Sequence, residues 1–211
     1  MTAIIDYGVG NLFSLVSSLR RIGEDAGVTD SEMTIRSADR IILPGVGAFC
    51  DARKKLEDSG LVPVLREAVE EGKPVLGICL GMQLFFDKSY EYGEYEGLGL
   101  IKGEIRSLSE TCGGLKIPHM GWNALHFVKP ASGKHPLFKY INEGDCVYFV
   151  HSFCGRDCED SLIAVTEYGC DVTAAVAKGN VMGCQFHPEK SGKTGLNILR
   201  AFCEMKEGFP C

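Results

Sequence analysis

Apolar positions in the first third of the chain alternate between short continuous runs and helical repeats. Residues 3–6, 40–43 and 74–78 are runs with the length of buried strands. Residues 12–22 carry apolar side chains at helical spacing, and residues 56–69 predict one or two further helices. Strands that alternate with helices in this way predict a parallel sheet with helices on both faces.

The pattern changes in the second half of the chain. Residues 90–99 are rich in Glu, Tyr and Gly and predict a surface loop, and residues 105–150 contain shorter strand-like pieces. Three more apolar runs predict a C-terminal antiparallel set: 162–166, 173–177 and 181–186. Residues 196–205 predict a closing helix, and no linker or repeat divides the sequence. We therefore expect an α/β fold with a single domain over residues 1–211, whose central, mostly parallel sheet is flanked by helices.

The most distinctive stretch follows the third run and reads Gly77-Ile78-Cys79-Leu80-Gly81-Met82-Gln83. A helical pattern begins at Met82, so Cys79 is expected on a tight turn between a strand and a helix. Glycines two positions to either side permit such a turn, because side chains there would collide with the bent backbone. This is the nucleophile-elbow pattern with Cys in place of Ser. The alternative is an ordinary buried Cys, so the interpretation depends on a base elsewhere.

The candidate base is His187, in Gln185-Phe186-His187-Pro188-Glu189. Pro188 favours an extended conformation at His187, in which the side chain of Glu189 projects to the same side. A carboxylate placed there can orient an imidazole, which is the third role in a catalytic triad. The alternative is a surface His beside a solvated Glu. His151 also follows an apolar run but has no carboxylate nearby, so we assign it a binding or packing role.

Three glycine-containing stretches resemble nucleotide-binding motifs and fail them. Gly8-Val9-Gly10 and Gly45-Val46-Gly47 lack the third glycine of the dinucleotide fingerprint. Gly192-Lys193-Thr194 lacks the first glycine of a P-loop. The loop at 44–49 is then either a plain tight turn or a place where the backbone must approach another group closely.

Charge and cysteine content narrow the class of protein. The formal net charge of −6, without a Lys/Arg cluster, argues against binding to nucleic acid or to an acidic membrane surface. No apolar run approaches the length of a membrane span, and the N-terminus reads as a first strand. The ten cysteines include no Cys-x-x-Cys pair and no zinc spacing. We expect a cytoplasmic protein with reduced cysteines, no metal and no cofactor.

Taken together, the elbow and the His-Pro-Glu motif resemble the class I (triad) glutamine amidotransferases. Four further segments are similar to one family within them, the glutaminase subunits of imidazole glycerol phosphate synthases: 5–11, 43–49, 118–123 and 185–191. The resemblance covers nearly the whole chain. It implies that Cys79 attacks the side-chain amide of glutamine, that His187 is the acid and base, and that Glu189 orients His187.

The resemblance also implies the rest of the site. The oxyanion would be held by the Leu80 N–H and by the backbone of Gly45, Val46 and Gly47. The glutamine pocket would be lined by four residues: Gln83, Glu91, Ser152 and Phe153. The family usually has Tyr where this chain has Phe153, so a hydroxyl contact there would be absent, whereas a backbone contact would be unchanged.

The implied partner is a (β/α)₈-barrel cyclase subunit, which would form a heterodimer with this chain. It would use the ammonia to make imidazole glycerol phosphate and aminoimidazole carboxamide ribonucleotide in histidine biosynthesis. Asn11, the segment 118–123 and Trp122 in particular are candidates for the interface, although Trp122 could equally be a core aromatic of a strand.

Three other functions stay open at this stage. The chain could be an amidotransferase for anthranilate, carbamoyl phosphate or nucleotide synthesis. It could be a non-catalytic regulatory module that keeps the fold. It could also be a Cys-dependent hydrolase of the α/β-hydrolase type, although that class would place the carboxylate before the His in the chain.

Overall fold

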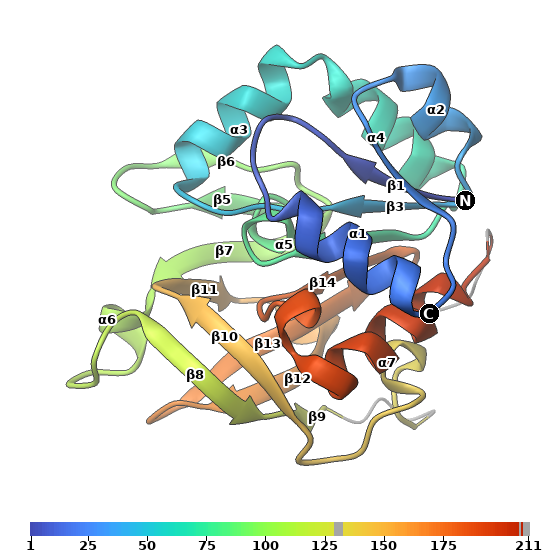
Figure 1. Cartoon of the computed structure of the whole chain (residues 1–211). Helices are drawn as coiled ribbons and strands as arrows, with labels where there is room; N and C mark the ends of the chain where they lie inside the picture. The colour runs from blue at the N-terminus through green and yellow to red at the C-terminus, as the bar shows by residue number, and fades with distance from the viewer. Residues whose placement is uncertain (129–132, 207, 209–211) are drawn as a thin grey trace.

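The core of the protein is an eight-stranded sheet with the order β2-β1-β3-β4-β14-β13-β12-β9 (Figure 1). The computed structural model describes residues 1–128, 133–206 and 208. The sheet consists of β1 (Thr2–Ile5), β2 (Ala26–Thr29), β3 (Arg40–Leu43), β4 (Val75–Ile78), β9 (His126–Phe127), β12 (Leu162–Glu167), β13 (Asp171–Lys178) and β14 (Val181–Cys184). Neighbouring strands from β2 to β14 in this order are parallel, and those from β14 to β9 are antiparallel.

Helices cover both faces of the parallel part (Figure 1). Helices α1 (Leu12–Arg21) and α7 (Gly192–Cys203) lie on one face. Helices α2 (Glu32–Ser37), α3 (Phe49–Asp58) and α4 (Leu61–Glu70) lie on the other. Strand residues divide between the two cores: Ile4, Ile42 and Leu76 pack with α1 and α7, and Ile5, Ile41 and Val75 pack with α2 to α4. Because successive strand residues point to opposite faces, a sheet covered on both sides requires continuous apolar runs.

Two smaller sheets build the region beside the carboxyl end of β4. One contains β5 (Phe86–Ser89), β6 (Tyr95–Glu96), β7 (Ile101–Ser107) and β11 (Phe153–Arg156), and the other pairs β8 (His119–Ala124) with β10 (Cys146–His151). Two short helices, α5 (Leu80–Gln83) and α6 (Leu108–Thr111), and three 3₁₀ turns (Pro136–Phe138, Glu159–Ser161 and Pro188–Lys190) complete the chain. Ser152 alone separates β10 from β11, so the chain changes sheets at this residue.

The α/β class with a mostly parallel central sheet is confirmed, with several differences in detail. The antiparallel strands join the main sheet, because β14 lies parallel to β4. The sequence did not predict β2 and α2; β2 is an edge strand with half-exposed side chains and therefore lacks a clear apolar run. The helix after the elbow is a single turn, and the predicted surface loop at 90–99 contains β6 and the buried Glu91.

Nine of the ten cysteines lie in the described part of the chain. Cys112 and Cys170 form a disulfide that joins the segment after α6 to the turn between β12 and β13, contrary to the expectation of reduced cysteines, and the other seven are free thiols. Cys211 lies outside the described residues, as do residues 129–132, 207, 209 and 210 of the expected single domain. No helix in the described ranges is long and apolar enough to cross a bilayer.

Candidate active site

The predicted elbow is present between β4 and α5. Cys79 has φ +54° and ψ −111°, a conformation that is uncommon for a residue other than glycine. A Cβ atom added at Gly81 would lie 1.9 Å from the Leu43 carbonyl oxygen, and one at Gly77 would lie 2.5 Å from the Phe85 ring. Both glycines are therefore required by close packing. The first backbone hydrogen bond of α5 runs from the Gln83 N–H to the Cys79 carbonyl, so the Leu80 N–H has no partner within its own turn.

His187 is held between a thiol and a carboxylate. Its Nδ1 lies 2.8 Å from Glu189 Oε1, and its side chain is hydrogen-bonded to Cys79. Its backbone is fixed as well, because its N–H donates to the Tyr148 carbonyl and its carbonyl accepts from Ser191 Oγ. Burial lowers the pKa of His187, but the hydrogen bonds to Cys79 and Glu189 and their negative charges outweigh it and raise the pKa to about 9. The imidazole therefore holds a proton more firmly than a free histidine does.

The loop Gly45-Val46-Gly47 lies against the elbow. A Cβ atom at Gly45 would be 2.7 Å from the backbone N of Gly81, so the backbone approaches the elbow closely at this point. The Tyr7 hydroxyl fixes the start of the loop by donating to the Pro44 carbonyl at 2.7 Å. Gly47 has φ +97°, which favours glycine. Of the two interpretations of this loop, the structure shows a close approach rather than a plain turn.

A pocket of about 370 Å³ opens over Cys79. Its lining includes Cys79 and His187, two members of the loop (Val46 and Gly47), Leu80, and all four predicted pocket residues: Gln83, Glu91, Ser152 and Phe153. A volume of this size is typical of a small-molecule site. Within the described residues, no three His, Cys, Asp or Glu side chains are grouped as they would be in a metal site.

The pocket contains buried polar groups with defined partners. Glu91 Oε2 accepts a hydrogen bond from the Phe49 N–H at the start of α3, and burial raises the pKa of this carboxyl group. Gln83 Nε2 donates to the Phe153 carbonyl at 3.1 Å and to Gln185 Oε1 at 3.0 Å. The side chains of Gln83 and Glu91 are thereby fixed at the edge of the pocket.

Sequence reasoning missed Gln185 as a site residue. Its side chain is fully buried, and its Nε2 lies 3.7 Å from Cys79 Sγ. The available signal was a polar residue inside the apolar run 181–186, since a buried amide needs hydrogen-bond partners. Tyr92 and Lys190 also line the pocket and were not predicted.

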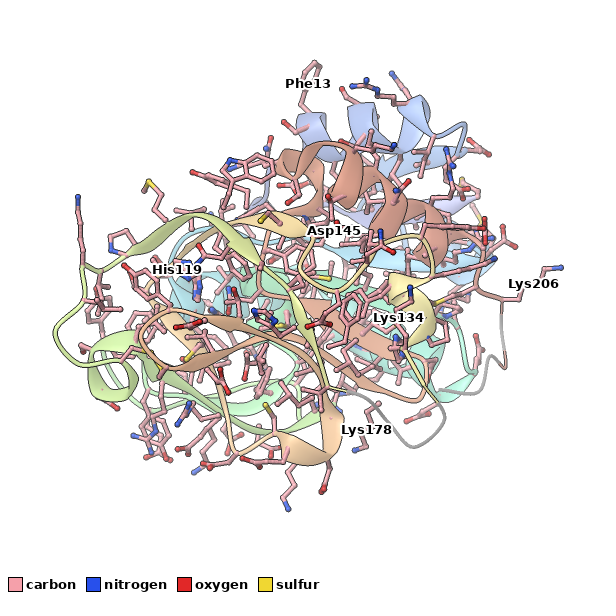
Figure 2. All side chains as sticks on the ribbon, turned by 90° about the horizontal axis from the view of Figure 1, so that it is seen from below. Phe13, His119, Lys134, Asp145, Lys178 and Lys206 are labelled. Atoms are coloured by element: carbon pink, nitrogen blue, oxygen red, sulfur yellow. A yellow bond between two sulfur atoms is a disulfide. The ribbon has the colours of Figure 1, made fainter. Side chains whose placement is uncertain are left out.

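The two predicted interface residues lie outside the pocket. Asn11 precedes α1 and borders a small cavity of about 10 Å³, together with Gly45, His187 and Glu189. Trp122 lies on β8 with its side chain 55% exposed and its ring edge against Tyr148, so it is not a core aromatic. Phe13 on α1 is 84% exposed, and Figure 2 shows it projecting away from the helix.

Comparisons with known sequences give a consistent result. The model of the family "Glutamine amidotransferase class-I" matches residues 3–205. The imidazole glycerol phosphate synthase subunit HisH of Caldanaerobacter subterraneus subsp. tengcongensis is 50% identical and covers 97% of this chain and 98% of its own. The subunit of the same name from Oceanobacillus iheyensis is 48% identical over 97% of this chain and 99% of its own.

Solved structures show the same fold at lower sequence identity. A crystal structure of a glutamine amidotransferase has a TM-score of 0.73 at 19% identity and covers 96% of this chain and 97% of its own. The structure of PurLQS from Thermotoga maritima has a TM-score of 0.71, also at 19% identity, with 95% and 96% covered. At such low identity these two structures speak for the fold alone.

Proposed function

This chain belongs to the class I glutamine amidotransferase family, and we propose that it hydrolyses glutamine and supplies the ammonia to a cyclase subunit in imidazole glycerol phosphate synthesis, a step of histidine biosynthesis. The observation that carries the chemistry is the buried His187, hydrogen-bonded to both Cys79 and Glu189 beside the pocket. The choice of partner rests on the relatives that are about half identical over nearly the whole chain.

The proposed reaction has two steps that share one base. The Cys79 thiolate attacks the side-chain amide carbon of glutamine, and His187 donates the proton it holds to the leaving nitrogen, which departs as ammonia. This leaves a glutamyl thioester on Cys79. His187 then takes a proton from the water that attacks the thioester, glutamate leaves, and the proton returns to Sγ. Glu189 keeps the imidazole in the required orientation throughout.

The charge that develops on the amide oxygen needs hydrogen-bond donors. The Leu80 N–H is the first, and the backbone of Gly45-Val46-Gly47 supplies the second. Removal of one such donor typically costs about 3 kcal/mol of transition-state stabilisation. Because the positive φ of Gly47 suits glycine in particular, a peptide rotation in this loop would turn the second donor toward or away from the oxyanion.

We assign substrate recognition to the pocket residues that take no part in the chemical steps. Gln83 and Glu91 border the substrate, and the backbone at Ser152 and Phe153 contacts its amino-acid end. The Phe153 ring packs edge-on against Tyr92 with a centroid distance of 5.9 Å. Because backbone atoms make the contact, Phe153 serves in place of the usual Tyr.

We assign the partner role to a (β/α)₈-barrel cyclase in a cytoplasmic heterodimer in which this chain forms one domain. Trp122 and Asn11 contribute to the interface. The exposed aromatic on β8 supports this assignment, since Trp is enriched at the centres of interfaces. Asn11 borders the small cavity that is also lined by His187. Ammonia released beside His187 would leave through this cavity.

The test is a glutaminase assay with and without the cyclase subunit and its nucleotide ligand. We expect weak turnover by the chain alone, strong turnover with both additions, and none with Cys79→Ala. Vigorous partner-independent turnover would contradict the coupling to a partner. Stimulation by a different synthase would reassign the partner, and failure of a glutamine-like electrophile to label Cys79 would indicate a non-catalytic module.

A further inference from the structure

A line of side-chain hydrogen bonds joins the exposed strand β8 to the wall of the pocket. Asn123 Oδ1 lies 2.9 Å from His119 Nε2, and His119 Nδ1 lies 2.9 Å from His151 Nε2. His151 Nδ1 lies 2.8 Å from the Phe153 carbonyl oxygen. At the other end, Asn123 Nδ2 donates to the Glu167 carbonyl at 3.0 Å. Neither histidine has a part in the two chemical steps described above.

The carbonyl groups of Phe153 and Glu167, at the two ends of this line of hydrogen bonds, determine which nitrogen atoms carry protons. A carbonyl only accepts, so a neutral His151 must carry its proton on Nδ1 and present Nε2 as an acceptor. His119 must then donate from its own Nδ1. These two bonds both point toward Phe153, and they need one proton each.

The contact between His119 Nε2 and Asn123 Oδ1 requires a further proton on His119. Asn123 donates to Glu167, so its Oδ1 faces His119 Nε2, and both atoms are acceptors unless His119 carries a second proton. When that proton leaves, the Asn123 amide must turn over, and its contact with the Glu167 carbonyl opens. Asn123 is half-buried, so water can replace this contact at little cost. Loss of this proton therefore opens the hydrogen bond between Asn123 and Glu167. The donors and acceptors in the bonds from His119 to His151 and from His151 to Phe153 stay the same.

The surroundings of His119 and His151 are consistent with a proton change at His119 and a neutral His151. Burial, together with the charges of His119 and His187, outweighs the hydrogen bond to the Phe153 carbonyl and lowers the pKa of His151 to about 3, so His151 stays neutral. Burial also lowers the pKa of His119, and the hydrogen bond to Asn123 offsets only part of this shift. Its ring is stacked on Phe149 and Tyr168, with centroid distances of 4.9 and 4.1 Å. The charged or titratable groups that line the pocket with His151 are Cys79, Glu91, Tyr92, His187 and Lys190.

The pocket wall is fixed at both of its carbonyl groups. The Ser152 carbonyl accepts from the Leu108 N–H at 2.9 Å. The Phe153 carbonyl accepts from Gln83 Nε2 at 3.1 Å and from His151 Nδ1 at 2.8 Å. Of the two bonds to the Phe153 carbonyl, the one from His151 is the shorter, and the His119 donor at His151 Nε2 holds the imidazole in the orientation that makes this bond.

We propose that His119 and His151 are positioning residues that hold the Phe153 carbonyl, and with it the 152–153 wall of the pocket, in the conformation that binds glutamine. The identity of the ligand rests on the proposed function. A wall that is already ordered needs no ordering when the substrate binds, so the pair acts on substrate affinity rather than on the chemical step. Without the donor on His119, His151 Nε2 loses its partner, and the imidazole is no longer held in the orientation that brings its Nδ1–H to the Phe153 carbonyl.

The first test follows the protons directly and needs no substrate. In the full chain with ¹⁵N-labelled histidine, nuclear magnetic resonance is recorded over a pH titration, and His119→Gln and His151→Gln assign the signals. We expect His151 to remain protonated at Nδ1 and unprotonated at Nε2, and, of the four ring nitrogens of this pair, only His119 Nε2 to titrate. Observation of His151 with its proton on Nε2 would overturn the proposal, whether or not the chain hydrolyses glutamine.

The second test measures glutamine turnover in the complex with the cyclase subunit. His119→Phe keeps a ring between Phe149 and Tyr168 but removes the donor, and we expect KM for glutamine to rise ~10-fold with kcat changed by less than about twofold. His119→Gln keeps an N–H donor and should recover most of the loss. His126→Gln, at an exposed histidine on β9, is the matched control and should leave both constants unchanged.

These outcomes separate the two proposals. A wild-type KM for His119→Phe, or a fall in kcat in place of a rise in KM, would overturn the positioning role. Absence of turnover by the unaltered complex would overturn the proposed function, and the proton arrangement would still be decided by the resonance experiment.

Discussion

Two buried histidines line the same pocket, and burial lowers the pKa of both, yet their net shifts are opposite. His187 is hydrogen-bonded to Cys79 and to the Glu189 carboxylate, and its pKa is raised to about 9. His151 is hydrogen-bonded to a neutral carbonyl and to His119, and its pKa is lowered to about 3. The charge of the neighbour, not the degree of burial, therefore decides which imidazole holds a proton.

The opposite pKa shifts of His187 and His151 suit two different roles within one site. An imidazole that takes and returns a proton suits acid and base catalysis. An imidazole that stays neutral in one tautomer suits a fixed hydrogen bond. The same residue type thus serves reaction chemistry at position 187 and geometry at position 151.

The largest expected effect is the direct contrast between these two positions. His187→Asn removes the acid and base, and we expect kcat to fall by about 10³-fold or more. His151→Asn should raise KM far more than it lowers kcat. Steady-state glutaminase kinetics of the complex measure both, and equal losses of kcat in the two variants would break the comparison.

Glu189→Gln tests the neighbour's charge without moving the imidazole. We expect kcat to fall by about 100-fold, because the ring loses its oriented, charged partner. The pKa of His187 should drop, so the alkaline limb of the pH–activity profile, set near pH 9 in the unaltered protein, should move to lower pH. An unchanged alkaline limb would show that Cys79 alone sets that pKa.

Stability should respond to pH with opposite signs at the two sites. The raised pKa of His187 gives a contribution present below pH 6.5 and lost as pH rises toward 9. The lowered pKa of His151 gives a contribution present above pH 6.5 and lost as pH falls toward 3. At about 1.4 kcal/mol per pKa unit, the contributions are expected to be about 3 kcal/mol for His187 and about 5 kcal/mol for His151.

Denaturant unfolding across the pH range measures these two contributions. His187→Gln should flatten the alkaline decline in the free energy of unfolding, and His151→Gln the acid decline. A variant that altered both limbs equally would show that the two histidines do not titrate separately.

The smallest expected effect concerns the strand at the far end of the hydrogen-bond line. Trp122→Ala should weaken binding of the cyclase subunit by about 10-fold, since an exposed aromatic anchor is lost next to Asn123. Met33→Ala, at a residue on α2 that is 78% exposed, is the control. Calorimetric titration with the partner compares the two variants, and equal affinities would remove Trp122 from the interface.

The elements that the sequence predicted best are those encoded by neighbouring residues. The elbow follows from seven consecutive residues, and the pairing of His187 with Glu189 follows from a spacing of two. The contact between His119 and His151 could not be predicted in this way, because it depends on the register in which β8 pairs with β10. Gln185 reaches Cys79 only because β14 lies beside β4.

What the sequence left open or missed has the same physical origin. Trp122 was left open between core and interface, because an aromatic in a strand does not show whether another layer will cover it. The edge strand β2 was missed since half-exposed residues give no continuous apolar run. Local pattern encodes local structure, and long-range pairing determines the rest.

The pairing of β14 with β4 also determines when, during synthesis and folding, the catalytic residues come together. Synthesis proceeds at about 5–20 residues per second, and Cys79 leaves the ribosome before β14 and His187, which follow it in the chain. Until β14 takes its place between β4 and β13, the thiol has neither its base nor Gln185 beside it. The catalytic arrangement therefore forms only when β14 is inserted into the sheet.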